Sequence, residues 1–153
     1  MTAERLIQML SQYPPGLTVL AFSSNPEKWG QIEDLWNFQL QTVRYGYLLD
    51  GVQFPADAEG GRSFIVISTG MHLGLSAEKA INALTSFDLE LPVVFEPYGS
   101  SAAHRYVEVA EVKMEKFGVF KRKFRDLTDG RDFLEDVYEE DANGLPRLLL
   151  NGT

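Results

Sequence analysis

The chain has 153 residues, a formal net charge of −8 and no cysteine, which excludes disulfides, thiolate metal sites and cysteine nucleophiles. A hydrophobic content of 44% with 12% aromatic residues is typical of a folded domain and excludes a disordered chain. No apolar run reaches the ~18 residues that a membrane-spanning helix needs, and the N-terminal residues lack the pattern of a signal peptide. We therefore expect a cytoplasmic protein without a membrane partner.

The first predicted element is a helix over residues 3–12. Its apolar residues follow helical spacing and are Ala3, Leu6, Ile7, Leu10 and Tyr13. Two prolines at 14 and 15 end it, and residues 17–22 then predict a buried strand. In residues 35–42 the large side chains of Trp36, Phe38 and Leu40 alternate with polar ones, which predicts a half-buried strand with Trp36 in the core. A short buried strand over residues 62–68 completes the first half.

Residues 76–94 repeat residues 2–20 at an offset of 74. The alignment has no gap from Thr2 and Ser76 to Leu20 and Val94. The identical pairs are Ala3/Ala77, Glu4/Glu78, Ile7/Ile81, Leu10/Leu84, Leu17/Leu91 and Val19/Val93. Self-similarity at a fixed offset is the signature of repeated structural units. We interpret it as an internal duplication.

The second half repeats the predicted order of elements. It has a helix over 77–86, a strand over 92–96, a long strand over 106–116 and a closing strand over 147–150. The apolar phase of the long strand slips, which predicts a β-bulge near Ala110 and Glu111. The closing glycines, Gly70 and Gly152, are related by an offset of 82, so we expect about eight added residues in the second half. Helical spacing among residues 133–138 predicts that they form a short extra helix.

The predicted fold class is therefore α+β, with two tandem helix–strand–strand–strand repeats in a pseudo-twofold antiparallel-sheet domain. The first repeat covers residues 1–75. The second covers residues 76–153 and contains a charged insertion near 126–142. A unit of about 75 residues buries little surface alone, so we expect the repeats to pack as one compact unit.

The N-terminal pattern LIxxLxxYPP, followed by a valine-rich strand, carries a family resemblance. Its residues are Leu6, Ile7, Leu10, Tyr13, Pro14, Pro15 and Val19. The pattern resembles a family of small uncharacterised proteins that are common in bacteriophage and prophage genomes. It covers each half once but is strong only in the first, because Asp88 and Leu89 stand where the second half would have prolines. The resemblance implies a phage or mobile-element origin and no particular activity.

The charges of the second half are separated along the chain. Residues 113–125 contain six bases and one acid, and residues 126–141 contain eight acids and one base. The basic stretch KFGVFKRKFR, at 116–125, interleaves bases with Phe117, Phe120 and Phe124, a pattern that could bind a nucleic-acid backbone and stack on bases. We favour another interpretation, in which the acidic stretch lies against the basic one as an intramolecular counter-charge.

No catalytic or metal-binding motif stands out. The two histidines, His72 and His104, lack neighbours at metal-ligand spacing. Asp126, Asp129 and Asp132 are three apart and do not match a calcium loop, which needs ligands at positions 1, 3 and 5. We therefore predict no catalytic residues, no metal site and no cofactor, and expect that the protein is not an enzyme.

Asymmetric charge favours a non-catalytic protein that binds another protein. With the phage or mobile-element origin that the resemblance implies, we expect it to modulate a host protein. The predicted partner-binding residues are Trp29, Lys121, Arg122, Lys123, Arg125, Asp132, Glu135, Asp136 and Glu139. A first alternative is a weak nucleic-acid-binding module that uses residues 116–125. A second alternative is a small-molecule pocket between the repeats, which would need convergent polar groups there.

Overall fold

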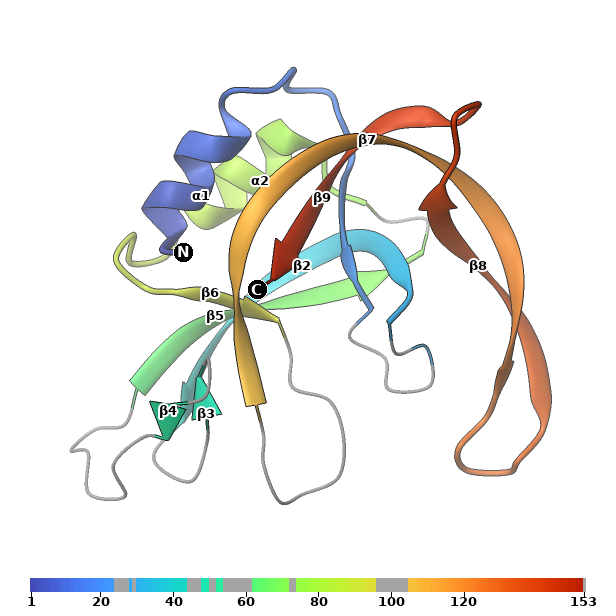
Figure 1. Cartoon of the computed structure of the whole chain (residues 1–153). Helices are drawn as coiled ribbons and strands as arrows, with labels where there is room; N and C mark the ends of the chain where they lie inside the picture. Colours follow the sequence, from blue (N-terminus) through green and yellow to red (C-terminus); the bar gives the residue numbers. More distant parts are fainter. Residues whose placement is uncertain are drawn as a thin grey trace.

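We describe a computed structural model of the chain over residues 1–23, 28, 30–43, 48–49, 52–53, 62–71, 74–95 and 105–152. Within these ranges the fold is mixed α+β (Figure 1). Its elements in chain order are α1 (Ala3–Leu10), β1 (Val19–Phe22), β2 (Ile32–Val43), β3 (Leu48–Leu49), β4 (Val52–Gln53), β5 (Arg62–Gly70), α2 (Ala77–Leu84), β6 (Val93–Phe95), β7 (Arg105–Arg125), β8 (Asp132–Glu140) and β9 (Leu145–Gly152).

Both predicted helices form, and they begin in the same way. The hydroxyls of Thr2 and Ser76 each accept a hydrogen bond at 3.2 Å, from the backbone N–H groups of Arg5 and Lys79. Each cap satisfies an N–H group that has no intrahelical acceptor. The apolar face that the spacing predicted is the buried face, formed by Ala3, Leu6 and Leu10 in α1 and by Ala77, Ala80 and Leu84 in α2.

Six strands hydrogen-bond to one another in a closed ring. Their order is β1–β2–β5–β6–β7–β9, and β9 returns to β1. The contacts β5–β6 and β9–β1 are parallel and the others antiparallel, so the prediction of an antiparallel sheet is wrong. Helix α2 explains the difference between β5 and β6, because a helical crossover returns the chain to run in the same direction.

The remaining strands lie beside this ring. β8 pairs with β7 along its whole length and with β2 through Tyr138 and Ile32, which joins it to the same sheet. The two-residue strands β3 and β4 pair with each other, and β3 also pairs with the start of β7. Figure 1 shows α1 and α2 next to each other on one side of the ring, whereas β8 lies on the other side.

Backbone contacts between the two halves occur in matched sets, at positions related by the offset of the sequence repeat. The N–H of Ala3 donates to the carbonyl of Leu91 at 2.9 Å, and the N–H of Ala77 donates to that of Leu17 at 2.8 Å. Further matched hydrogen bonds run from Glu4 to Leu89 and from Glu78 to Pro15, and from Val93 to Met1 and from Val19 to Leu75. Each helix start is therefore held by the turn before the other half's first strand.

One apolar cluster fills the space between the helices and the ring. The first half contributes Ala3, Leu6, Leu10, Val19, Ala21, Leu35, Phe38, Ile65 and Ile67. The second half contributes Ala77, Ala80, Leu84, Val93, Phe95, Val109, Val112, Leu148 and Leu150. Each residue of the first set has its counterpart in the second. The offset is 74 in the helix and the first two strands, and it is 83 in the closing strand.

The offset of the closing strands corrects the predicted length of the insertion. Phe38 pairs with Ile67 in the first half, and Val112 pairs with Leu150 in the second. The offset from Phe38 to Val112 is 74 and the offset from Ile67 to Leu150 is 83, so alignment of the two halves on these positions gives an insertion of nine residues. The prediction of about eight relied on Gly70 and Gly152, which do not occupy equivalent register positions.

A β-bulge interrupts the long strand of each half. The register of β7 shifts between Val109 and Glu111, which confirms the predicted bulge, and β2 shifts in the same way around Trp36. The extra residue lets Leu35 and Phe38 both point into the core, while Trp36 is 50% exposed. The prediction of Trp36 as a core residue is therefore wrong, because strict alternation assumes an uninterrupted strand.

The acidic segment forms a strand and not the predicted helix. β8 pairs antiparallel with β7 from Asp132, opposite Arg125, to Glu140, opposite Phe117. β7 accordingly continues past Lys116, where the sequence predicted its end. Paired apolar residues at 133, 134, 137 and 138 fit either a helix or the two faces of a strand. The strand is favoured here because β7 offers its side chains basic and aromatic cross-strand partners.

Substitutions of Leu10 and Leu84 test whether both halves share one core. Both side chains are fully buried, so we expect Leu10→Ala and Leu84→Ala each to lower the free energy of unfolding by about 2–5 kcal/mol. Urea unfolding followed by circular dichroism should show one transition that both variants shift. The exposed Gln8→Ala is the control, with an effect within about 0.5 kcal/mol. Two transitions, each sensitive to one variant, would contradict a shared core.

Candidate functional site

The candidate site is a hairpin over residues 118–140, which we call the arm. It consists of the end of β7, a turn and β8, and Figure 1 shows it extending from the ring on the side away from α1 and α2. The N–H of Asp126 donates to the carbonyl of Arg131 at 2.8 Å across the turn. Gly130 has a φ of 72° there, a left-handed conformation that glycine adopts without steric cost. The turn is thus built to reverse the chain tightly.

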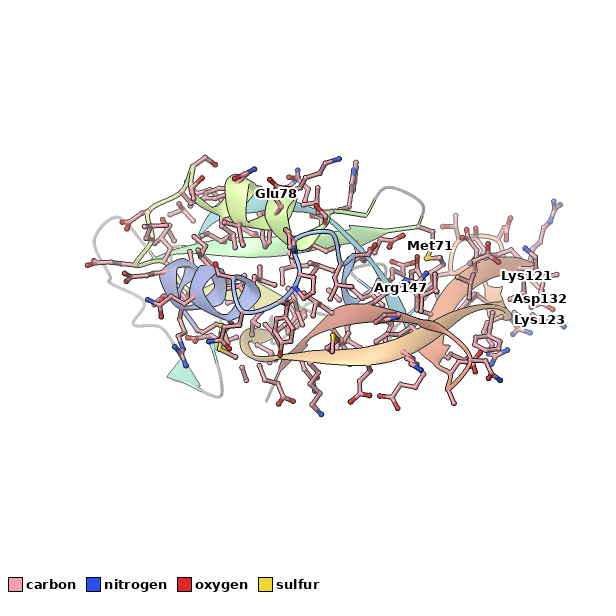
Figure 2. All side chains as sticks on the ribbon, turned by 90° about the horizontal axis from the view of Figure 1, so that it is seen from above. Met71, Glu78, Lys121, Lys123, Asp132 and Arg147 are labelled. Carbon is pink, nitrogen blue, oxygen red and sulfur yellow. The ribbon has the colours of Figure 1, made fainter. Side chains whose placement is uncertain are left out.

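Basic residues on β7 pair with acidic residues on β8. Lys121 Nζ lies 3.2 Å from Asp136 Oδ1, and Lys123 Nζ lies 3.1 Å from Asp132 Oδ2. Two further pairs join Arg125 to Asp132 and Arg122 to Glu139. The predicted intramolecular counter-charge therefore forms. Figure 2 shows Lys121, Lys123 and Asp132 together on the arm, at the end of the molecule that lies away from Glu78 of α2. Exposed ion pairs add only about 0–1 kcal/mol each, so these pairs chiefly favour one register of the two strands.

The arm also presents apolar side chains. The rings of Phe124 and Phe133, on neighbouring strands, have centroids 5.7 Å apart. On the opposite face, which also carries Lys121 and Lys123, Leu134 is 66% exposed and Val119 is 49% exposed. Exposed apolar groups among charged ones on a projecting element are typical of surfaces that bind other proteins.

A buried charged cluster joins the arm to the ring. Lys28 Nζ donates hydrogen bonds to Glu33 Oε1 at 2.7 Å and to Glu135 Oε2, on β8, at 3.0 Å. Lys28 and Glu33 are only 4% and 3% exposed, so each charge depends on the other. Burial alone would lower the pKa of Lys28, but the hydrogen bonds to Glu33 and Glu135 outweigh it and raise the pKa above 10.5. Lys28 is therefore a cation that ties β8 to β2.

Tyr138 makes a second connection between the arm and the ring. Its hydroxyl donates to Asp34 Oδ1 at 3.1 Å, and the Arg147 guanidinium lies over its ring at 4.8 Å. Its backbone pairs with Ile32 of β2. Burial and the negative charge of Asp34 raise the pKa of Tyr138 to about 12. The phenol therefore stays protonated at neutral pH and keeps donating to the carboxylate.

The structure brings most of the predicted partner-binding residues together in the arm. These are Lys121, Arg122, Lys123, Arg125, Asp132, Glu135, Asp136 and Glu139. Glu135 differs from the rest, because its carboxylate contacts Lys28 at the base of the arm. Trp29, His72 and His104 lie outside the described residues. That the arm residues bind a partner stays a prediction.

Sequence reasoning missed the buried cluster at the base of the arm. A usable signal was present, since Glu33 and Asp34 are adjacent acids directly before the apolar Leu35. A buried carboxylate needs a donor or a cation, and Lys28 lies five residues from Glu33. Glu135 lies 107 residues from Lys28, so its part in the cluster could not be read from sequence.

No protein-family model matches the chain, and neither a curated protein nor a solved structure matches it. The resemblance to phage proteins therefore stays a prediction, and function has to be argued from the residues of this chain. Among the described residues, neither helix combines the length and apolar character needed to cross a membrane. The same residues contain no group of three or more histidines or carboxylates arranged to hold a metal ion.

The contact between Tyr138 and Asp34 predicts a pH dependence. The folded pKa of Tyr138, about 12, lies above the ordinary 10.0, so its contribution to stability is complete below pH 10 and is lost as the pH rises through 12. We expect the stability advantage of the natural protein over Tyr138→Phe to shrink across this range in urea unfolding. Ultraviolet titration of phenolate should show one late-ionising tyrosine that Tyr138→Phe lacks. Identical titration curves would contradict this assignment.

Proposed function

We propose that the protein is a non-catalytic module that binds another protein through the arm. The supporting observation is a projecting hairpin with exposed apolar and charged side chains, anchored at its base by the buried Lys28–Glu33–Glu135 cluster. An element that is already ordered loses little conformational entropy when it binds, which favours affinity. If the resemblance carried by residues 6–19 reflects a phage or mobile-element origin, the partner is a host protein.

Charge favours a protein partner over nucleic acid. The bases Lys121, Arg122, Lys123 and Arg125 each face a carboxylate of β8. Residues 117–140 together contain five bases and seven acids, a net charge of −2. Non-specific affinity for a phosphate backbone comes almost entirely from neutralising its charge, whereas a protein partner can also contact the exposed Leu134 and Val119. The nucleic-acid interpretation of residues 116–125 is therefore the weaker one.

The contact between the halves also gives little support to a small-molecule site. The cluster between the helices and the ring consists of apolar side chains. A surface depression of about 310 Å³ between α1 and α2 is lined by Leu10, Ser11, Tyr13, Pro15, Glu78, Ile81 and Asn82. Specific ligand sites place several convergent polar groups in an enclosed cavity, whereas Glu78 is the one charged group in this lining.

We further propose that the chain arose by tandem duplication of a helix–strand–strand–strand unit and retains pseudo-twofold symmetry. Support comes from the matched backbone bonds, the nine pairs of core residues and the bulge at equivalent positions of β2 and β7. The segments after the long strands reach equivalent positions, although β8 runs antiparallel to β2 and β3 runs parallel to β7. β8 pairs with Ile32, and β3 pairs with Tyr106, which is the counterpart of Ile32 in the repeat. The arm then occupies the place where the second unit gained nine residues.

An exchange of helix sequences tests the duplication. If the helices are equivalent, a chimera with the α2 sequence AEKAINAL at residues 3–10 should fold with one transition. Its main loss is the Leu6→Ala cavity, about 2–5 kcal/mol of the free energy of unfolding. In urea unfolding, the chimera should have about the same free energy of unfolding as the Leu6→Ala variant, which is the matched control. A chimera without the β-sheet signal in circular dichroism, next to a folded Leu6→Ala, would argue against equivalence.

Site-specific photo-crosslinking tests the docking role of the arm. We expect a photoreactive benzoylphenylalanine in place of Leu134, which is 66% exposed, to yield one discrete protein adduct in a bacterial lysate. The adduct should survive nuclease treatment. The same group in place of the exposed Gln8 of α1 is the control and should yield none. Adducts with nucleic acid, or the same adducts from both positions, would argue against the arm as a protein-docking element.

A further inference from the structure

The outer edge of β7 is open along the arm. Phe117 pairs with Glu140 of β8 and also with Leu145 of β9, so these two strands lie on opposite edges of β7. Pairing with β9 ends at Phe117, whereas pairing with β8 continues to Arg125. In the part of the chain that the structure describes, residues 118–125 therefore have a strand on one edge only.

The ladder pattern identifies which backbone groups point outward. Hydrogen-bonded and non-bonded pairs alternate along an antiparallel ladder. The N–H of Asp126 donates to Arg131 at 2.8 Å, and the N–H of Asp141 donates to Lys116 at 2.9 Å. Even-numbered residues of β7 thus bond to β8, and the odd-numbered ones turn their N–H and C=O groups to the other edge, where the carbonyl of Lys121 accepts a hydrogen bond from Arg122 Nη1 at 3.2 Å. The odd-numbered residues are Val119, Lys121, Lys123 and Arg125.

The length of this edge suits the addition of another strand. Four outward-facing residues span seven positions, within the usual strand length of 3–10 residues. An extended peptide that adds to a sheet edge gains affinity from main-chain hydrogen bonds and specificity from alternate side chains. The arm offers both, because its backbone is already held in an extended conformation by β8.

Charge defines the chemistry of the missing strand. Residues 119–125 read VFKRKFR, with four bases and no acid. The strand already on the inner edge, β8, reads DFLEDVYEE, in which acids and apolar residues alternate along each face of the strand. Opposite charges facing each other across strands contribute about 0.2–1 kcal/mol per pair, and like charges are destabilising. An acidic strand with interspersed apolar residues matches this edge, whereas two β7 edges would repel each other.

We propose that residues 119–125 of β7 bind an extended acidic segment of the partner protein by β-strand addition. This inference depends on the proposed role of the arm in docking, and it names both the binding mode and the chemistry of the partner. Lys121 and Lys123 pair with β8 through exposed side chains, so they can exchange these contacts for the carboxylates of an added strand.

A labelled peptide DFLEDVYEE, which copies β8, tests the binding mode by fluorescence anisotropy with the full chain. The decisive variants are Lys123→Pro and Lys123→Ala. Both variants lose the ion pair with Asp132 of β8, but only proline removes the outward N–H, and no main-chain hydrogen bond to β8 is lost in either variant. We expect Lys123→Pro to bind about tenfold or more weakly than Lys123→Ala, because a partner carbonyl is left without its donor.

Further peptides keep the test decisive if Lys123→Pro does not fold. Two peptides are N-methylated at alternate residues, one at the odd and one at the even positions, so that each loses its main-chain donors on one edge. The peptide whose methylated edge faces β7 should not bind. A peptide with lysine in place of every acid should also fail to bind. Binding of the acidic peptide should weaken as salt is raised, since ion pairs at an exposed edge are screened.

Several results would overturn the proposal. Equal affinity for Lys123→Pro and Lys123→Ala would mean that the peptide replaces β8 on the inner edge. The absence of binding, or association of the chain with itself that Lys123→Pro abolishes, would equally reject an acidic partner strand. If the crosslink from Leu134 still identifies a protein, the docking role survives and only strand addition fails. If that crosslink is absent as well, both proposals fail.

Discussion

The fold depends on the parallel pairing of strands from different halves. β5 pairs with β6 and β9 with β1, so each half closes the ring of the other. The N-terminal ends of the helices also connect the two halves. The first N–H groups of each helix donate hydrogen bonds to carbonyl groups that precede the first strand of the other half. A half of about 75 residues buries a smaller fraction of its surface than the whole chain does, which limits its stability on its own. Shared edges and a common apolar cluster remove that limitation.

Local signals in the sequence were sufficient for the elements of each half. Helical spacing and the caps Thr2 and Ser76 located both helices, and the phase slip at Ala110 located the bulge in β7. The matching bulge at Trp36 was missed, because Trp36, Phe38 and Leu40 happen to alternate as an uninterrupted strand would. The acidic segment was misassigned for a related reason. Its spacing fits helix and strand alike, and the deciding partner, β7, precedes it across a turn.

Contacts between residues that are far apart in the sequence could not be predicted from local sequence patterns. Nothing near β5 indicates that its neighbour is β6, because the direction of a strand after a helical crossover depends on the whole chain. The cluster at the base of the arm has the same character. Lys28 and Glu33 are close in sequence, but Glu135 contacts Lys28 across 107 residues and Tyr138 contacts Asp34 across 104. The sequence showed the basic and acidic stretches that form the arm, but it did not show that they pair as a β-hairpin.

Two kinds of charge perform different tasks in the arm. Lys28 and Glu33 are withdrawn from water, so neither can lose its partner without leaving a buried charge, and they hold the base of the hairpin in one position. Lys121 and Lys123 remain in solvent and form pairs that are easily exchanged. The protein thus combines a fixed attachment with an adaptable surface.

The pairing of β1 with β9 also has a consequence for biosynthesis. Val19 meets Leu148 in the ring, so β1 leaves the ribosome long before the strand that covers its edge exists. Contacts of such sequence separation slow folding, and unpaired strand edges promote aggregation in the meantime. Helix α1 and the antiparallel pairing of β1 with β2 can form early, but ring closure has to follow translation of β9. Until then the nascent chain keeps an unpaired edge on β1, which chaperones and proteases can reach.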